Sequence, residues 1–323
     1  MIVQSLIHYR KKTLVLALGV AITGTVISGS LILGDSVRHS LKTIALEKIG
    51  RIQWSLQTGE RLLGAALAAR MEQELSTPVI QAILLTGIAG SHGGRLRVNG
   101  VRIAGVDDRF FTLSPSGGTM EITPGHALIN AKLARKLNLK INDEINVSVR
   151  KPTFLPTDSP FSTGNDYIGF RLKIQAIVDK ESFGKFSLTI SPETPPGIFV
   201  ARTYLAAKLD SAGRVNTLLV AERENLKTAD IERAFTAAWT LEDTGLTITE
   251  IPGKDVFELR TRRVFISKNS VEIIRNSFPE AEYLFSYFVN SIRKNGRRAP
   301  YSIMSAPPRA GGGSLPEDGI IIN

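Results

Sequence analysis

The residue types that most often carry catalysis are sparse in this sequence. Ser182 and Lys185, and again Ser291 and Lys294, fit the S-x-x-K pattern in which penicillin-recognising enzymes place their nucleophilic serine. The S-D-N and K-T-G sequences that accompany this pattern in those enzymes do not occur. We interpret both matches as chance and predict that the protein is not an enzyme. A hydrolase that uses Ser182 and Lys185 stays as an alternative, which requires the two side chains to be close together and accessible.

The sequence also contains no pattern that indicates a metal site, a nucleotide site or an acid–base pair. The chain has four histidines and no cysteine, and the histidines share no metal-ligand spacing. The paired carboxylates Asp107–Asp108 and Glu317–Asp318 would point to opposite faces of a strand, so we expect solvated turns there. No G-x-x-x-x-G-K-[ST] sequence occurs, so the chain has no Walker A phosphate loop of its own. We predict no metal site and no bound cofactor.

The composition is that of a folded protein with a basic balance. The 323 residues are 43% hydrophobic and 22% charged, and the net charge is +10. Such a charge suits nucleic acid, an anionic membrane surface or simple solubility. Small basic clusters lie at Arg260–Arg263 and Arg293–Arg298, but no nucleic-acid-binding motif accompanies them. We therefore expect no nucleic-acid partner.

One apolar segment is long enough to cross a membrane. Residues 13–33 carry no charge, and as a helix with ~1.5 Å rise per residue they would match the ~30 Å hydrocarbon core of a bilayer. Cleaved signal peptides have shorter apolar regions and end in small residues, whereas Leu31, Ile32 and Leu33 follow the small residues here. We predict an uncleaved transmembrane helix at 13–33, preceded by a tail at 1–12.

Charge around the span suggests its orientation. Arg10, Lys11 and Lys12 precede the span, which favours a cytoplasmic N-terminus by the positive-inside rule. Basic residues also follow the span at a comparable distance, but long domains translocate largely regardless of charge. We expect the residues after the span to lie outside the cytoplasm.

Small residues mark one face of the predicted span. Ala17, Ala21, Thr25 and Gly29 recur every four residues. This spacing lets a second transmembrane helix approach closely, so it predicts a partner helix on this face. The alternative is the general abundance of glycine and alanine in transmembrane helices.

The helical pattern continues beyond the span. In residues 34–52, Val37, Leu41 and Ile44 follow the helical period, and charged residues occupy the other faces. We predict an amphipathic stalk helix, which would couple motion in the membrane to the domain beyond. The alternative is the first helix of a globular domain.

Residues 53–323 mix strands and helices without the strict alternation of a doubly wound sheet, which predicts an α+β fold. Asn99–Gly100 between alternating segments predicts a hairpin turn. A strand ending at Ile129, an N-cap at Asn130, a helix and a strand from Ile145 are expected in sequence. Further predicted elements are a strand at 170–179, a helix at 203–210, a strand at 214–222, a helix at 225–239 and a long Pro-rich loop at 151–166.

The end of the chain repeats an earlier pattern. "DGIIIN" at 318–323 matches "GHALIN" at 125–130, where the final asparagine is expected to open a helix. At Asn323 no helix follows, so we expect a fragment boundary there.

Several segments together resemble one family. "YRKKTLVLALGVAITGTVISGSLILGDSVRHSLKTIALEKIGRI", "VRIAGVDDRFF", "INAKLARKLNLKINDEINV", "IFVARTYLAAKL", "GRVNTLLV" and "YFVNSIRKNGRRAPYSIMSA" are similar to successive parts of FtsX-like, MacB-type ABC-transporter permeases. The resemblance implies that residues 53–323 form a MacB-like periplasmic core domain in a bacterial cell membrane. It also implies four transmembrane helices in a complete permease half, of which three follow the core domain, and this chain has no second apolar span.

The resemblance further implies a function. ATP would be hydrolysed by a separate cytoplasmic ATPase, and the permease, together with a second copy or half, would pass the motion across the lipid bilayer by mechanotransmission. The runner-up is a stand-alone, single-span membrane-anchored adaptor for which Asn323 is the true end. Lipoproteins, lipids, peptides, drugs or cell-wall hydrolases all stay open as substrates or partners.

Overall fold

The computed structural model describes residues 8–306 except for 60, 92, 95, 152–166, 190, 192, 254, 262–265, 267 and 284. The predicted Pro-rich loop, apart from Lys151, and the "DGIIIN" segment at 318–323 therefore lie outside the described residues, as does Glu317–Asp318. The chain divides into two compact units, Met1–Arg262 and Arg263–Asn323, each described by itself.

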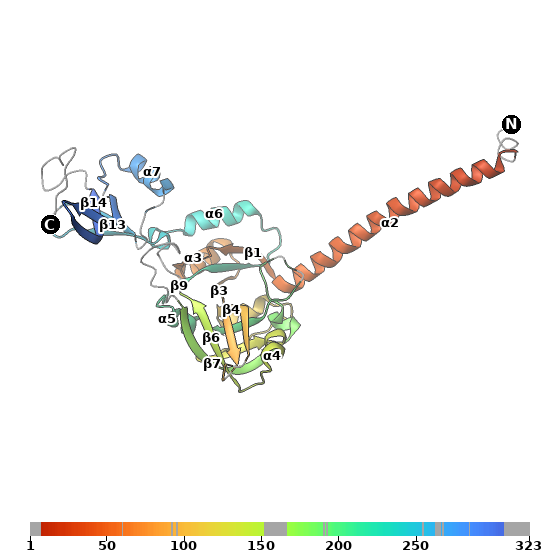
Figure 1. Ribbon diagram of the computed structural model, residues 1–323, viewed down its shortest axis with the longest axis horizontal. Coiled ribbons are helices and arrows are strands. Elements are labelled where there is room, and N and C mark those ends of the chain that lie inside the picture. The colour runs from red at the N-terminus through yellow and green to blue at the C-terminus, as the bar shows by residue number, and fades with distance from the viewer. Residues whose placement is uncertain are drawn as a thin grey trace. The chain divides into compact units, whose positions relative to one another are not determined.

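The first unit contains one long helix, α2 (Arg10–Ile49), which runs without a break for 40 residues (Figure 1). At ~1.5 Å per residue it is about 60 Å long. Among the described residues it is the one helix long and apolar enough to cross a membrane. It ends three residues before the predicted end of the stalk, because Ile52 already pairs with Ala221 in a sheet.

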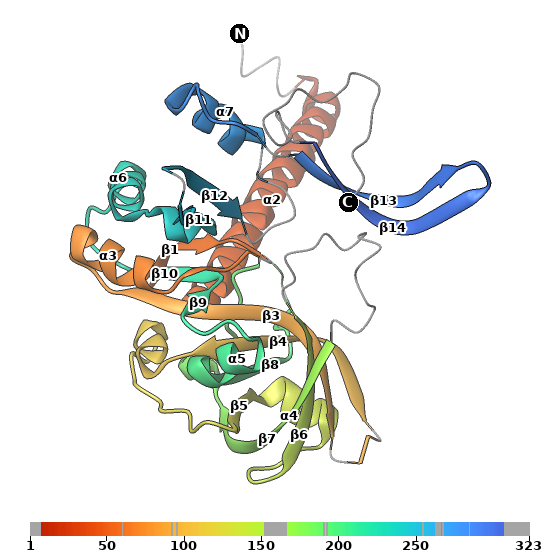
Figure 2. The ribbon, with the colours of Figure 1, turned by 90° about the vertical axis from the view of Figure 1, so that its left-hand side faces the viewer.

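A mixed sheet of eight strands forms the body of the first unit, in the order β1-β10-β3-β4-β8-β5-β7-β6. Its strands are β1 (Ile52–Gln57), β3 (Val79–Ser91), β4 (Arg97–Val106), β5 (His126–Asn130), β6 (Glu144–Arg150), β7 (Tyr167–Val178), β8 (Gly197–Ala201) and β10 (Thr217–Ala221). Strand β6 also pairs with β3, so the six strands from β3 to β6 close into a ring (Figure 2). Closure removes the free edges of these strands, as in a small barrel.

Strand β3 changes partner along one edge. Its residues 79–82 pair with β10, and its residues 87–91 pair with β6. Between these stretches, the buried side chain of Asn216 accepts from the backbone N–H of Leu84 and donates to its carbonyl oxygen, both at 2.8 Å. The amide thus replaces a strand backbone at the point where β3 leaves one partner for the other.

Helices and short elements complete the unit. Helix α3 (Ala66–Leu75) packs against α6 (Thr228–Ala238), and both contribute to the larger apolar core. The other elements are α4 (Ala131–Leu137), α5 (Arg202–Lys208), η1 (Asp108–Leu113), η2 (Lys180–Gly184), η3 (Leu241–Thr244), and the strand pairs β2 (Leu63–Gly64) with β9 (Arg214–Val215) and β11 (Leu246–Glu250) with β12 (Phe257–Thr261).

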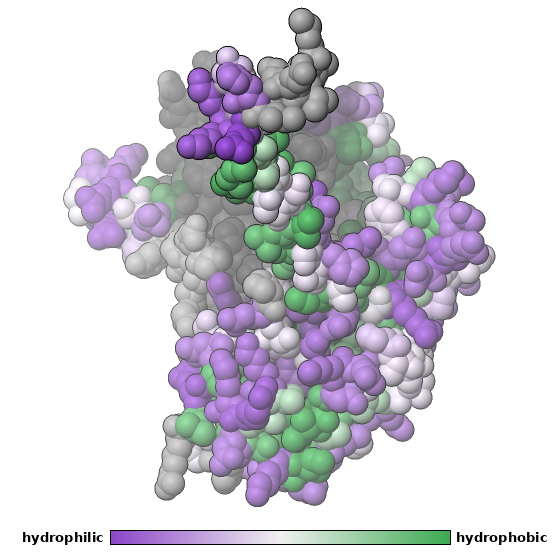
Figure 3. Space-filling model, turned by 90° about the vertical axis from the view of Figure 1, so that its right-hand side faces the viewer, coloured by the Kyte–Doolittle hydropathy of each residue, from purple (hydrophilic) through white to green (hydrophobic). Residues whose placement is uncertain are grey.

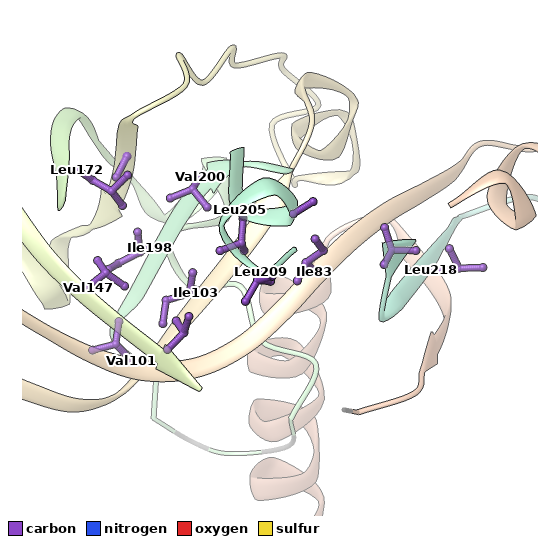
Figure 4. Packing of buried hydrophobic residues seen from close by; sticks show 14 of the residues in the cluster. Ile83, Val101, Ile103, Val147, Leu172, Ile198, Val200, Leu205, Leu209 and Leu218 are labelled. Atoms are coloured by element: carbon purple, nitrogen blue, oxygen red, sulfur yellow. The ribbon is translucent and has the colours of Figure 1, made fainter. Parts of the chain in front are cut away.

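Two apolar clusters hold these elements together. In the larger one, Ile103, Val147 and Ile198 come from different strands of the ring, and Leu205 and Leu209 reach the same cluster from α5 and the residue after it (Figure 4). The smaller one is rich in phenylalanine, and Ile49 at the end of α2 packs against it. Its phenylalanines are Phe110, Phe111, Phe183, Phe186 and Phe199. The end of the long helix is therefore attached to the smaller cluster.

Strong local signals in the sequence are confirmed. The side chain of Asn130 accepts from Leu133 N at 3.0 Å and caps α4, which follows β5 and precedes β6 as predicted. Strand β7, α5, β10 and α6 also lie where strands and helices were expected. The mixture of strands and helices confirms the α+β class.

The predicted hairpin turn is wrong. Asn99 and Gly100 lie inside β4, and the chain turns between Ser91 and Arg97 instead. Ile88 pairs with Asn99 and Gly87 with Val101, so Gly100, at φ +67°, is the extra residue of a β-bulge. A glycine in the left-handed region occurs in β-bulges as well as in hairpin turns, so the Asn-Gly dipeptide alone does not distinguish the two.

The second unit contains α7 (Lys268–Ser277) and a hairpin of β13 (Phe285–Lys294) and β14 (Arg297–Ala306). The two strands are antiparallel and pair with each other alone among the described residues. Asn295 and Gly296 form the turn with φ of 49° and 76°, and positive φ at both central residues is typical of Asn-Gly hairpin turns.

Candidate functional site at the end of the long helix

The predicted packing face lies on α2 and is open. Ala17, Ala21 and Thr25 are exposed, and a Cβ added at Gly29 would meet nothing within 4 Å. Thr25 donates to the carbonyl of Ala21 at 2.8 Å, so its hydroxyl is satisfied within the helix. Figure 3 shows apolar surface along α2 below a hydrophilic N-terminal end. The helix partner on this face stays a prediction.

The stalk residues approach the domain in order along the helix. Val37 and Leu41 are 49% and 50% exposed, whereas Ile44 is half-buried. Four residues further on, Lys48 is only 2% exposed. The predicted apolar stripe of the stalk therefore ends on a buried lysine.

Lys48 is fixed by backbone carbonyls from a distant segment. Its Nζ donates to the carbonyl oxygens of Ser191 and Glu193, the latter at 2.9 Å. Burial lowers the pKa of the Lys48 ammonium group, and the neighbouring cations Lys185 and Lys132 lower it further. The two carbonyls supply the hydrogen bonds that make a buried ammonium group tolerable.

An ion pair lies beside this anchor. The Glu47 carboxylate accepts from Lys185 Nζ at 2.5 Å, and this contact holds the pKa of Glu47 below its usual range. Lys185 directly follows η2, whose Phe183 is fully buried with its ring centroid 4.8 Å from that of Phe110. The partner of Glu47 is thus held by the phenylalanine cluster.

The chain leaves the helix through a residue that must be glycine. Gly50 has φ +57°, and a Cβ there would clash with the carbonyl oxygen of Leu113. The next residue, Arg51, donates from its N–H to Leu113 O at 2.7 Å, and its carbonyl accepts from Glu222 N at 2.7 Å. We call Glu47, Lys48, Gly50 and Arg51, with the groups that bind them, the helix–domain junction.

The candidate catalytic pairs are not assembled. The Ser182 N–H donates to Asp179 at 2.8 Å, and Lys185 pairs with Glu47 instead of Ser182. Ser291 and Lys294 lie three residues apart in β13, so they face opposite sides of the hairpin.

The remaining candidates are dispersed. Burial raises the pKa of Asp107, which directly precedes η1, whereas Asp108 is exposed. Within the described part of the chain, no three His, Asp or Glu side chains could hold a metal ion together.

The sequence pattern contained a signal for Lys48 that periodicity alone could not interpret. Lys48 lies four residues after Ile44, on the stripe that Leu41 and Ile44 define. A charged residue on the apolar face of a helix indicates a specific partner, but its partners here are 143 and 145 residues away.

No protein-family model and no curated protein matches this chain. Solved structures do match it. The chain is similar in structure to the periplasmic region of MacB. That structure, from Actinobacillus actinomycetemcomitans, shares 10% identity over 68% of this chain and 84% of its own, with a TM-score of 0.33. The extracellular domain of the noncanonic ABC-type transporter YknZ from Gram-positive bacteria shares 9% identity over 56% of this chain and 88% of its own, also with a TM-score of 0.33.

Proposed function

We propose that this chain is the N-terminal part of a permease subunit of an FtsX/MacB-like ABC transporter, in which α2 carries movement from the membrane to the extracytoplasmic domain. The observation that carries the proposal is the continuity of α2, which joins a membrane-length apolar segment to the helix–domain junction without a break. An α-helix is a stiff element, so displacement at one end is delivered to the other.

The junction suits this role because it holds the helix end at several independent points. Lys48 binds two carbonyls, Glu47 binds Lys185, and the backbone of Arg51 binds two further segments. Ile49 adds contact with the phenylalanine cluster. A helix end held by charge, backbone and apolar contacts together resists bending there when the helix is pushed.

The partners follow from the same proposal. In this proposal the ATPase is a separate cytoplasmic subunit, and the absence of a Walker A loop from these 323 residues is consistent with that. A second permease copy or half packs on the face of Ala17, Ala21, Thr25 and Gly29. The N-terminal tail is cytoplasmic, and the domain lies outside a bacterial cell membrane.

Nucleotide-dependent crosslinking tests this function. The chain has no cysteine, so Leu41→Cys gives a single reactive thiol on the exposed side of the stalk. In native membranes that contain the ATPase, disulfide formation between two copies should differ between nucleotide-free samples and samples with ATP and vanadate. Lys136→Cys, exposed on α4, is the control and should show no such difference. Equal yields at Leu41→Cys in both states would reject the permease and favour the single-span adaptor.

A further inference from the structure

The tip of the β13–β14 hairpin concentrates positive charge. Arg293 pairs across the strands with Arg298, and Lys294 pairs with Arg297, directly beside the turn. All four side chains belong to exposed residues. Like charges opposite each other in a hairpin destabilise it, so this arrangement is one that folding alone would disfavour.

No acidic residue offsets this charge. The chain has no Asp or Glu between Glu282 and Glu317, a stretch that includes the whole hairpin. Within the part of the chain that the structure describes, none of the four cations takes part in an ion pair. The tip is therefore a free cationic surface.

The geometry of the hairpin indicates the shape of its partner. Each strand has ten residues, which at ~3.4 Å per residue puts the tip about 30 Å from the open end of the hairpin. Because side chains alternate along a strand, Arg293 and Arg298 lie on one face, and Lys294 and Arg297 lie on the other. A partner on one face would meet two of the four cations, whereas a broad surface approached tip first meets all four.

We propose that this tip binds the anionic headgroup layer of a lipid membrane. The same chain has a helix that is long and apolar enough to cross a membrane, and a domain anchored by such a helix would work beside lipid. Lysine and arginine side chains are attracted to anionic lipid surfaces. A nucleic-acid partner is disfavoured because the sequence from Val289 to Pro300, which surrounds these cations, contains no aromatic residue that could stack on bases. The inference goes beyond the proposed function and rests on one part of it, the anchoring of α2 in a membrane, but not on the permease role.

Vesicle flotation tests the proposal with the full chain. The protein is placed in nanodiscs of neutral lipid, so that α2 is embedded there and cannot insert into vesicles. It is then mixed with vesicles of phosphatidylcholine with or without phosphatidylglycerol. We expect flotation with the anionic vesicles alone and weaker binding as salt screens the charges. In R293Q/K294Q/R297Q/R298Q the partition coefficient should fall about tenfold or more.

Two further variants make the outcome decisive. R97Q/K136Q/K140Q/K173Q removes the same charge from exposed residues of the first unit and should keep most of the binding. R293K/R297K/R298K keeps the charge at the tip and should bind as the unchanged chain does. Neutralising the tip removes cross-strand repulsion, and circular dichroism checks that the hairpin variants fold. Equal losses in both quadruple variants, or binding to soluble polyphosphate without binding to anionic vesicles, would overturn the proposal.

Discussion

Gly50 is the residue that lets α2 enter the domain. Its backbone lies at φ +57° and ψ −127°, a region that residues with a side chain rarely adopt. The space a Cβ would need is occupied by the Leu113 carbonyl, which accepts from the N–H of Arg51. Backbone strain and steric conflict therefore coincide at this one position.

Gly50→Ala should destabilise the domain. We expect the free energy of unfolding to fall by about 2 kcal/mol or more, because the strained backbone and the displaced Leu113 carbonyl both contribute. Gly34→Ala is the matched control, since Gly34 lies within α2 with nothing within 4 Å of its added Cβ, and it should be neutral or slightly stabilising. Denaturant unfolding measures both, and equal stabilities for the two variants would contradict this reading of Gly50.

Asp107 is expected to make the stability of the fold depend on pH. Burial raises the pKa of Asp107 above the ordinary aspartate value of 3.8, and its Oδ1 has no hydrogen-bond partner among the described residues. The folded state therefore binds this proton more tightly than the unfolded state, and the ionised carboxylate weakens the fold above the folded pKa.

Asp107→Asn should accordingly raise the free energy of unfolding at neutral pH. The gain should shrink as pH falls through the folded pKa of Asp107 and vanish below 3.8, where the carboxyl group is protonated in both states. Thermal unfolding across this range measures the effect, and the exposed Glu121→Gln is the control. A difference between Asp107→Asn and the unchanged chain that does not vary with pH would refute it.

At the scale of elements, the open face of α2 carries the prediction of a partner helix. Replacing Ala21 and Thr25 together by leucine should weaken dimerisation in lipid about tenfold or more, because larger side chains keep the two backbones apart. The control Thr23→Leu with Ser30→Leu makes similarly large additions on the opposite side of the helix and should leave dimerisation unchanged. Energy transfer between labelled copies in vesicles measures the association, and undiminished dimer in the first variant would reject this face.

Elements whose signals are local could be predicted from the sequence. The Asn130 cap, the apolar spacing of α4 and the alternation of β6 each lie within a few residues, so the strand–helix–strand segment was predicted correctly. Asn99–Gly100 failed because the left-handed glycine it supplies suits a bulge as well as a turn. Closure of the ring through β3 and β6 depends on long-range pairing, which periodicity does not encode.

At the helix–domain junction, too, local features could be predicted from the sequence and long-range contacts could not. The stalk helix and its stripe follow from residues three and four apart, so Val37, Leu41 and Ile44 could be named from the sequence. The carbonyls of Ser191 and Glu193 reach Lys48 only through the fold, and no local pattern links them to it. The long helix was thus predictable, and its anchor was not.

For the whole molecule, orientation across the membrane is the first test. Because the chain has no cysteine, His8→Cys and Lys136→Cys each introduce one thiol, before the span and in the domain beyond it. A membrane-impermeant maleimide is applied to cells in which the reagent has access to the outer face of an intact cell membrane. It should label Lys136→Cys at once and His8→Cys only after the cell membrane has been permeabilised. The reverse pattern would contradict the proposed orientation.

In the proposed mechanism α2 and the domain move as one body. Spin labels at Arg38→Cys on α2 and Lys136→Cys on α4 report the distance across the helix–domain junction in nanodiscs. We predict one narrow distance distribution that Lys48→Met broadens, because this substitution removes both hydrogen bonds of the anchor. A distribution that is already broad in the otherwise unchanged chain would show that the junction is flexible and would contradict transmission of movement through α2.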